Sequence, residues 1–217
     1  MKSVHESNSN SVVLLFSGGI DSTVLLYKLI ADGYSVYPLH IDYGQITVKG
    51  EMAAITSILN DCNLSHNFFR LNVPDIARIG AGTLIGEYPK KKYDLQEWYK
   101  KEFFPNRNLM LLTFATIYCY KIAANHVAIG ITGEQSYADT SAQFIDSMNQ
   151  LFSQTLHNIK IVAPYSNTQR HMLMDEGLRL HVPFDKTFSC NASSDHHCLF
   201  CTSCADREIA LKYVQGK

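Results

Sequence analysis

Short apolar runs alternate along this chain with longer segments whose apolar residues recur every three or four positions. The short runs predict five buried strands, at residues 12–16, 35–41, 66–71, 127–131 and 159–163. The longer segments predict amphipathic helices, at residues 22–31, 47–60, 109–124, 140–156 and 168–180. Strands that alternate with helices predict an α/β fold, with a parallel five-stranded sheet and helices on both faces.

Three stretches qualify this pattern. Pro38 lies inside the second strand, and a proline cannot donate a hydrogen bond to a neighbouring strand. The helix at 109–124 is apolar on nearly every side, which predicts that it is buried. Residues 73–104 are irregular and contain several glycines, and a loop of this length favours a substrate lid. The basic run at 90–92 inside it is typical of a solvated face.

Composition narrows the possible classes of protein. The 217 residues are 46% hydrophobic and 18% charged, which fits one domain with a small appendage. The net charge of −1 gives no sign of a nucleic-acid partner, and no apolar run has the length of a membrane span. The polar start of the chain lacks the core of a secretory signal. We therefore expect a cytoplasmic protein with a loose tail at residues 1–11.

The candidate chemistry begins directly after the first strand, with Ser17, Gly18, Gly19, Ile20, Asp21, Ser22 and Thr23. The two glycines allow a sharp turn, and Asp21 or Ser22 can cap the helix that follows. Free backbone amides and the positive end of the helix dipole then converge on one point, which attracts phosphate. The string Ser-Gly-Gly-x-Asp-Ser resembles the pyrophosphate loop of the ATP pyrophosphatases, which use ATP to adenylate a substrate. The alternative is a glycine turn with an ordinary aspartate cap.

Other polar residues follow the predicted strands. In a parallel sheet, ligands bind outside the carboxyl ends of the strands. Asp42, Tyr43, Gly44 and Gln45 follow the second strand, and residues 132–134 follow the fourth. The run Pro105, Asn106, Arg107 and Asn108 opens a helix and can face the same crevice.

Four cysteines near the end of the chain form a candidate metal site, namely Cys190, Cys198, Cys201 and Cys204. Their C-x7-C-x2-C-x2-C spacing suits four thiolates around a structural Zn²⁺, and Lys186, Arg207 and backbone amides are expected to offset the negative charge. An iron–sulfur cluster is the main alternative, because C-x2-C-x2-C also occurs in ferredoxins. We interpret His196 and His197 as loop residues, and Cys62 and Cys119 as core residues.

These motifs together resemble the 7-cyano-7-deazaguanine synthase family of ATP-dependent, zinc-containing enzymes. The resemblance spans about residues 12–212. It implies conversion of the carboxylate of 7-carboxy-7-deazaguanine to a nitrile, with ATP and ammonia, in a homodimer. It also implies an ATP-binding domain at 12–183, with the lid at 73–104, and a zinc-binding segment at 184–217. The cofactors that it implies are ATP, Mg²⁺ and Zn²⁺.

The resemblance assigns roles to single residues. The ATP-binding set is Phe16, Ser17, Gly18, Gly19, Ile20, Asp21, Ser22 and Thr23. The candidate catalytic set is Asp21, Ser22, Arg107 and Asp139. The candidate substrate-binding set is Asp42, Tyr43, Gln45, Asn106, Arg107, Asn108, Gly133 and Glu134. Asp21 or Asp139 can contact Mg²⁺, or each can serve only as a cap or loop residue. Arg107 can pair with a carboxylate or phosphate, or form a structural salt bridge.

The sequence departs from the family pattern in three places. Ile46 and Thr47 replace an Arg-His pair, residues 137–141 replace a Tyr-Pro-Asp-Cys-Arg stretch, and Phe188 replaces a Trp or Leu. The changed stretch at 137–141 leaves open an enzyme that joins the activated deazaguanine to an amine of a protein, as in phage-defence branches of the family. A tRNA-thiolating enzyme and a non-catalytic nucleotide-binding module are further alternatives.

Overall fold

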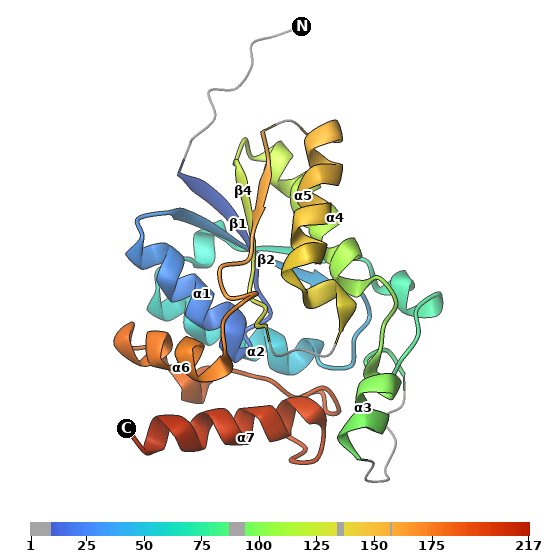
Figure 1. Cartoon of the computed structure of the whole chain (residues 1–217), viewed down its shortest axis with the longest axis vertical. Helices are drawn as coiled ribbons and strands as arrows, with labels where there is room; N and C mark the ends of the chain where they lie inside the picture. Colours follow the sequence, from blue (N-terminus) through green and yellow to red (C-terminus); the bar gives the residue numbers. More distant parts are fainter. Residues whose placement is uncertain (1–9, 87–93, 134–136, 157) are drawn as a thin grey trace, which may run out of the picture.

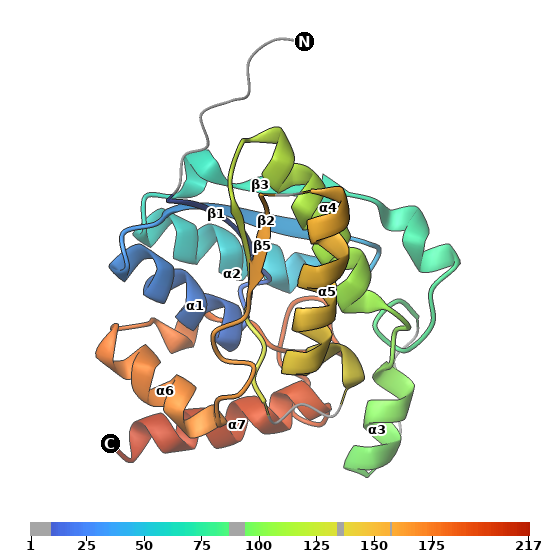
Figure 2. The same cartoon turned by 45° about the horizontal axis from the view of Figure 1, so that its top comes forward.

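The computed structural model describes residues 10–86, 94–133, 137–156 and 158–217, and it contains a central sheet covered by helices on both faces (Figures 1 and 2). The strands of the described chain are β1 (Ser11–Leu15), β2 (Ser35–Asp42), β3 (Phe69–Asn72), β4 (His126–Ile129) and β5 (Lys160–Val162). All pairs are parallel, and the strand order is β3-β2-β1-β4-β5. The α/β fold class expected from the alternation is therefore confirmed.

The helices of the described chain are α1 (Ile20–Ala31), α2 (Val48–Asp61), α3 (Leu95–Glu102), α4 (Arg107–Lys121), α5 (Ala142–Thr155), α6 (Arg170–Arg179) and α7 (Thr202–Gln215). Side chains of β1 alternate between the two faces of the sheet. Val12 and Leu14 pack into one core with residues of α1, α2, α6 and α7. Val13 and Leu15 pack into a second core with residues of α4 and α5. The carboxyl end of β1 lies between these layers, where the chain order reverses toward β4.

Pro38 is accommodated inside β2 because of where β3 begins. Leu39 accepts a hydrogen bond from Phe16 N on the β1 side, so the preceding position directs its backbone toward β3. The β3 strand pairs with β2 only from Leu39 onward. The missing amide of Pro38 therefore falls where no ladder partner is required.

The expectation that residues 109–124 form a buried helix holds on one side only. The helix is α4, and Leu112, Ala115 and Cys119 are fully buried on one side. On its other side Ile117 is 59% exposed and Tyr120 is 71% exposed. An apolar sequence on every side does not by itself bring protein to every side, because the sheet offers only one surface to pack against.

The expectation that residues 73–104 are irregular is also wrong in part, because α3 lies within this stretch. Asp94 begins the helix, and its side chain accepts a hydrogen bond from Glu97 N. Trp98 is 1% exposed and anchors the helix near Phe200, beside α7 (Figure 2). The basic run at 90–92 lies outside the described residues. The lid itself stays a prediction.

The C-terminal segment shares the main core. Phe188, Cys190, Cys201 and Ala210 belong to the same cluster of buried residues as β1 and α1. Helix α7 runs along α6 in both views (Figures 1 and 2). Among the described residues, no helix is long and apolar enough to cross a membrane.

Candidate active site

The loop after β1 has the strand–glycine–helix geometry that the sequence predicts, with a different cap. Helix α1 begins at Ile20, and Gly19 is its N-cap without a side-chain hydrogen bond. The expected capping by Asp21 or Ser22 is therefore wrong. Ser22 Oγ and Thr23 Oγ1 instead donate to Gly19 O at 3.1 and 2.7 Å and brace the loop from inside. The first amides of α1 lack partners within the helix, which leaves them available for an anion.

The loop is also fixed from the C-terminal segment. Gly18 has φ +74°, a left-handed conformation that glycine adopts without strain, and a Cβ there would lie 2.9 Å from Ala54 Cβ. Its carbonyl accepts a hydrogen bond of 2.9 Å from Phe188 N. The nucleotide loop and the cysteine segment are thereby joined through main-chain atoms.

Gly130, directly after β4, allows the start of α1 to approach the end of this strand. A Cβ at this position would lie 2.8 Å from the carbonyl carbon of Asp21 and from Ser22 N. We expect Gly130→Ala to lower stability by about 1–3 kcal/mol and to weaken ATP binding, because the start of α1 must shift. Urea unfolding and ATP titration measure both effects. Gly86→Ala is the matched control, since the nearest atom to its added Cβ is 3.8 Å away; equal effects of both variants would contradict the prediction.

A cavity of about 290 Å³ opens beside this loop, at the carboxyl ends of β1, β2 and β4. Most of the predicted ATP-binding residues line it, namely Phe16, Ser17, Gly19, Ile20, Asp21 and Ser22. Gly18 and Thr23 stand behind the loop and support it instead. The cavity therefore lies where a parallel sheet with this strand order binds ligands.

Arg170 pairs with Asp21 across this cavity. Its Nη1 lies 3.3 Å from each carboxylate oxygen of Asp21. Burial raises the pKa of Asp21, and the Arg170 charge acts in the opposite direction. No sequence motif assigned a role to Arg170. Its position in the sequence could have indicated one. A cation in the first turn of α6 is unfavourable for the helix dipole, so an arginine there indicates a role other than helix stability.

Tyr43 and Arg107 meet on the opposite side of the cavity, and both line it. The positive charge of Arg107 acts against the effect of burial on the pKa of Tyr43. Burial raises the pKa of Tyr43 to about 12, so the phenol is neutral at physiological pH. The cavity wall therefore includes a guanidinium, which can bind a carboxylate or phosphate.

A buried pair between β2 and α2 forms the floor beneath Tyr43. His40 Nε2 lies 2.7 Å from Glu51 Oε2, and Gln45 Nε2 donates to the same oxygen at 3.0 Å. Thr47 Oγ1 donates to Glu51 Oε1 at 2.6 Å. Burial alone would raise the pKa of Glu51, but the hydrogen bonds outweigh it and hold the pKa below 4.5. Gln45 also accepts from Tyr43 N, so this predicted substrate residue shapes the wall through the backbone.

The lowered pKa of Glu51 has a consequence for stability. A group whose pKa is lower in the folded state stabilises the fold above its unfolded pKa, and this contribution is lost as the pH falls through the folded pKa. We expect Glu51→Gln to lower the free energy of unfolding at neutral pH by about 1–3 kcal/mol. The difference from the unmodified chain should shrink on acidification below the usual glutamate pKa of 4.5. Urea unfolding across this range measures it, and a difference that is constant with pH would contradict the expectation.

The remaining predicted residues take varied positions. Asn108 lines the cavity, and Asp139 caps α4 by accepting from Asn108 N at 3.1 Å. Asp42 does not line the described cavities, because its carboxylate binds Arg70 at 2.6 Å. Asn106 is the N-cap of α4 in a left-handed conformation, with φ 56°. Gly133 N donates to Thr168 O, and Glu134 lies outside the described residues. The substrate and Mg²⁺ roles of all these residues stay predictions.

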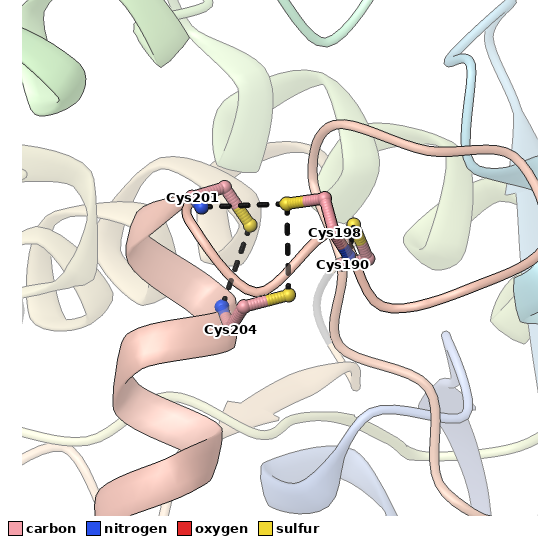
Figure 3. A group of neighbouring side chains, drawn as sticks. All are labelled: Cys190, Cys198, Cys201 and Cys204. Atoms are coloured by element: carbon pink, nitrogen blue, oxygen red, sulfur yellow. Dashed lines mark hydrogen bonds between the residues drawn. The ribbon is translucent and has the colours of Figure 1, made fainter. Parts of the chain in front are cut away.

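The four predicted cysteines converge on one point (Figure 3). Their sulfurs all lie within 4.8 Å of one another, and Cys198 Sγ is 3.8 Å from Cys204 Sγ. Ligands about 2.3 Å from one tetrahedral ion stand about 3.8 Å apart, so this spacing fits a single Zn²⁺. All six cysteines are free thiols.

Backbone amides surround these sulfurs. Cys190 Sγ accepts from Ala192 N at 3.3 Å and from Cys198 N at 3.5 Å, and Cys201 Sγ accepts from Asn191 N at 3.4 Å. Such N–H donors stabilise negative charge on sulfur, as metal-binding thiolates require. The expected role of Lys186 in offsetting the charge is wrong, because its ammonium binds Asp61 at 2.5 Å.

Arg207 lies closer to the expectation than Lys186 does. It is buried, lies one helical turn after Cys204 on α7, and donates to Phe184 O at 2.9 Å and to Thr187 Oγ1. His197 Nε2 accepts from Ser189 N, and the exposed His196 bonds Ser193 and Asp195, so neither histidine belongs to the sulfur cluster. Cys119 is a core residue as expected, whereas Cys62 is only half-buried.

A second cavity, of about 210 Å³, adjoins the first. Five residues line both, namely Arg107, Arg170, Asn191, Ser203 and Asp206. Asn191 and Ser203 are neighbours of the metal-site cysteines in sequence. The sulfur cluster therefore lies next to residues that line both cavities.

The fold and the loop after β1 define an α/β protein of the ATP pyrophosphatase class. A family model described as "Queuosine biosynthesis protein QueC" matches residues 11–215. The chain belongs to this QueC family. It is 47% identical over 203 residues to a 7-cyano-7-deazaguanine synthase 1 of Desulfitobacterium hafniense (strain Y51), covering 94% of this chain and 92% of that protein.

More distant proteins agree in family or in fold. A 7-cyano-7-deazaguanine synthase of Archaeoglobus fulgidus is 32% identical over 204 residues, covering 92% of this chain and 84% of that protein. The structure of NMN synthetase from Francisella tularensis superposes with a TM-score of 0.52 at 12% identity, over 97% of this chain and 79% of that one. The second likeness shows the fold alone. The family resemblance predicted from the motifs is confirmed.

Proposed function

We propose that this protein is a 7-cyano-7-deazaguanine synthase, which activates the carboxylate of 7-carboxy-7-deazaguanine with ATP for attack by ammonia. The observation that carries the proposal is the pair of adjoining cavities with two guanidinium groups at their junction. One cavity contains the phosphate-binding loop, and the other can hold the acceptor. The names of the relatives and the family support the same reaction.

The arrangement accounts for each bond change. A carboxylate oxygen attacks the α-phosphorus of ATP, and pyrophosphate leaves toward the amides at the start of α1. Ammonia attacks the acyl adenylate and displaces AMP, which gives an amide. A second ATP adenylates the amide oxygen, and loss of AMP and protons leaves the nitrile. Arg107 orients the acceptor carboxylate, and Arg170 faces the phosphates.

Three further assignments rest on the chemistry of the site. We assign Mg²⁺ to the phosphates of ATP, with Asp21 as its nearest carboxylate once Arg170 turns toward pyrophosphate. We assign Zn²⁺ to the four cysteines, because a [4Fe–4S] cluster binds its cysteines through four separate irons and needs wider spacing than 4.8 Å. When bound, zinc would link residues 190–204 into one closed segment. Cysteines without disulfides fit a cytoplasmic location.

Mass spectrometry of a defined reaction tests the function. Purified protein, 7-carboxy-7-deazaguanine, Mg·ATP and ammonium should give 7-cyano-7-deazaguanine with AMP and pyrophosphate. A product that stops at the amide would contradict the nitrile step. Deazaguanine attached to added protein would show that an amine of a protein, not ammonia, is the nucleophile. Absence of acceptor-dependent ATP–pyrophosphate exchange would reject the enzyme altogether. Iron and acid-labile sulfide in the protein would favour the thiolation alternative instead of zinc.

We also propose that the protein is a homodimer that uses the outer side of α4. Ile117 and Tyr120 are exposed there, and Tyr118 stacks on Phe69 of β3 at 4.9 Å between ring centres, so the apolar surface continues over the edge of the sheet. Ile117→Lys should convert the dimer to a monomer in light-scattering chromatography. Ile209→Lys on α7, where isoleucine is 68% exposed, should leave the dimer intact. A dimer in both variants would place the interface elsewhere.

A further inference from the structure

The second cavity is lined by groups suited to a flat heterocycle. Tyr99 and Tyr137 line it and contact each other edge to face, with ring centres 5.7 Å apart. The Tyr137 hydroxyl donates to Tyr99 O at 3.1 Å, which fixes one ring relative to the other. Leu84 adds an apolar side chain. Such a site combines apolar contact for a ring with a few polar groups that set its orientation.

Glu102, the last residue of α3, places a carboxylate in the wall of this cavity. The residue is 3% exposed. Its Oε2 accepts from Thr202 Oγ1 at 2.6 Å and from Asn191 Nδ2 at 3.1 Å. These two donors fix the orientation of the carboxylate. A carboxylate has about four acceptor positions and no donor, so it selects groups that carry hydrogen.

The position of Arg107 and Arg170 orients an acceptor between the cavities. If the proposed function holds, the carboxylate of the substrate must reach the α-phosphate in the first cavity. Arg107 lines both cavities and can bind that carboxylate, while Arg170 faces the phosphates. The ring that bears it then extends into the second cavity, toward Tyr99 and Glu102.

We propose that Glu102 is the residue that selects the base, by accepting hydrogen bonds from the ring N–H and the 2-amino group of the deazaguanine. These two donors lie side by side on one edge of the ring, and they reach Oε1, because Oε2 already accepts from Thr202 and Asn191. An adenine-type edge presents a ring nitrogen acceptor in place of the N–H and is repelled by the carboxylate. The inference rests on the proposed function and adds a specificity-determining residue to it.

Competition between two substrates tests the assignment. The unmodified protein receives 7-carboxy-7-deazaguanine and its analogue without the 2-amino group, and kcat/KM is compared for each. We expect a preference of about 10- to 100-fold for the amino compound, because loss of a hydrogen bond to a buried charge has an effect of this order. Glu102→Gln should reduce that preference to about threefold or less, and KM for ATP should stay within about twofold.

Two variants separate recognition from support of the fold. Thr202→Val removes a donor to Glu102 but keeps the carboxylate, so the preference should remain at least tenfold. Asp206→Asn removes the acid shared by both cavities and should likewise leave the preference. Loss of the preference in Asp206→Asn but not in Glu102→Gln would overturn the assignment in favour of Asp206. An unchanged preference in Glu102→Gln would overturn it outright, whereas no turnover of either substrate by the unmodified protein would reject the proposed function.

Discussion

Replacing Arg107 by alanine should lower kcat/KM for the acceptor by about 10²–10³-fold. Arg107 lines both cavities, so its charge lies where the acceptor carboxylate and the α-phosphate must meet. Removal of one pre-oriented donor at a reacting group has an effect of this size in other enzymes. Single-turnover release of pyrophosphate with saturating ATP measures the chemical step directly.

Two further variants define the role of Arg107. Arg107→Lys keeps the charge but loses the two-pronged geometry, so it should recover only part of the rate. Tyr43→Phe removes the hydroxyl from the cavity that Arg107 also lines and keeps the ring, and it should reduce the rate by about tenfold or less. A rate for Arg107→Ala within about threefold of the unmodified protein would show that the guanidinium has only a structural role.

Replacing Cys201 by serine should abolish stoichiometric zinc binding and lower the midpoint of thermal unfolding by about 10 °C or more. Cys201 is fully buried, and its sulfur lies in the cluster within 4.8 Å of the other three (Figure 3). A structural zinc site contributes directly to folding free energy, so loss of a ligand reaches beyond the site. Metal analysis and calorimetry measure the two effects.

The matched control is Cys62→Ser. Cys62 is a half-buried free thiol at the end of α2, outside the sulfur cluster, so zinc content should not change. Cys201→Ser, but not Cys62→Ser, should also weaken ATP binding, because Phe188 N, in the segment that contains the four cysteines, donates to Gly18 O of the nucleotide loop. Full zinc content in Cys201→Ser would refute the ligand assignment.

Sequence periodicity was sufficient for the sheet and most helices, but it did not give the surroundings of each element. The run at 109–124 is apolar on every side, yet α4 leaves Ile117 and Tyr120 exposed, because burial depends on what packs against a helix. Helix α3 was missed since its eight residues are mostly charged or polar. Its stability comes from one buried side chain, Trp98, whose partners lie about a hundred residues away in sequence.

The amino-acid sequence was sufficient to determine the parallel sheet, because strands that alternate with helices have few other ways to pair. It also determined the loop after β1 and the cluster of four cysteines, because the residues of each are close in sequence. Tertiary structure alone decided which polar groups share a cavity. Asp42 turned toward Arg70, Asp139 toward the start of α4, and Arg170 toward Asp21. A carboxylate binds the nearest donor that folding supplies, and no local pattern reveals a donor from a distant segment.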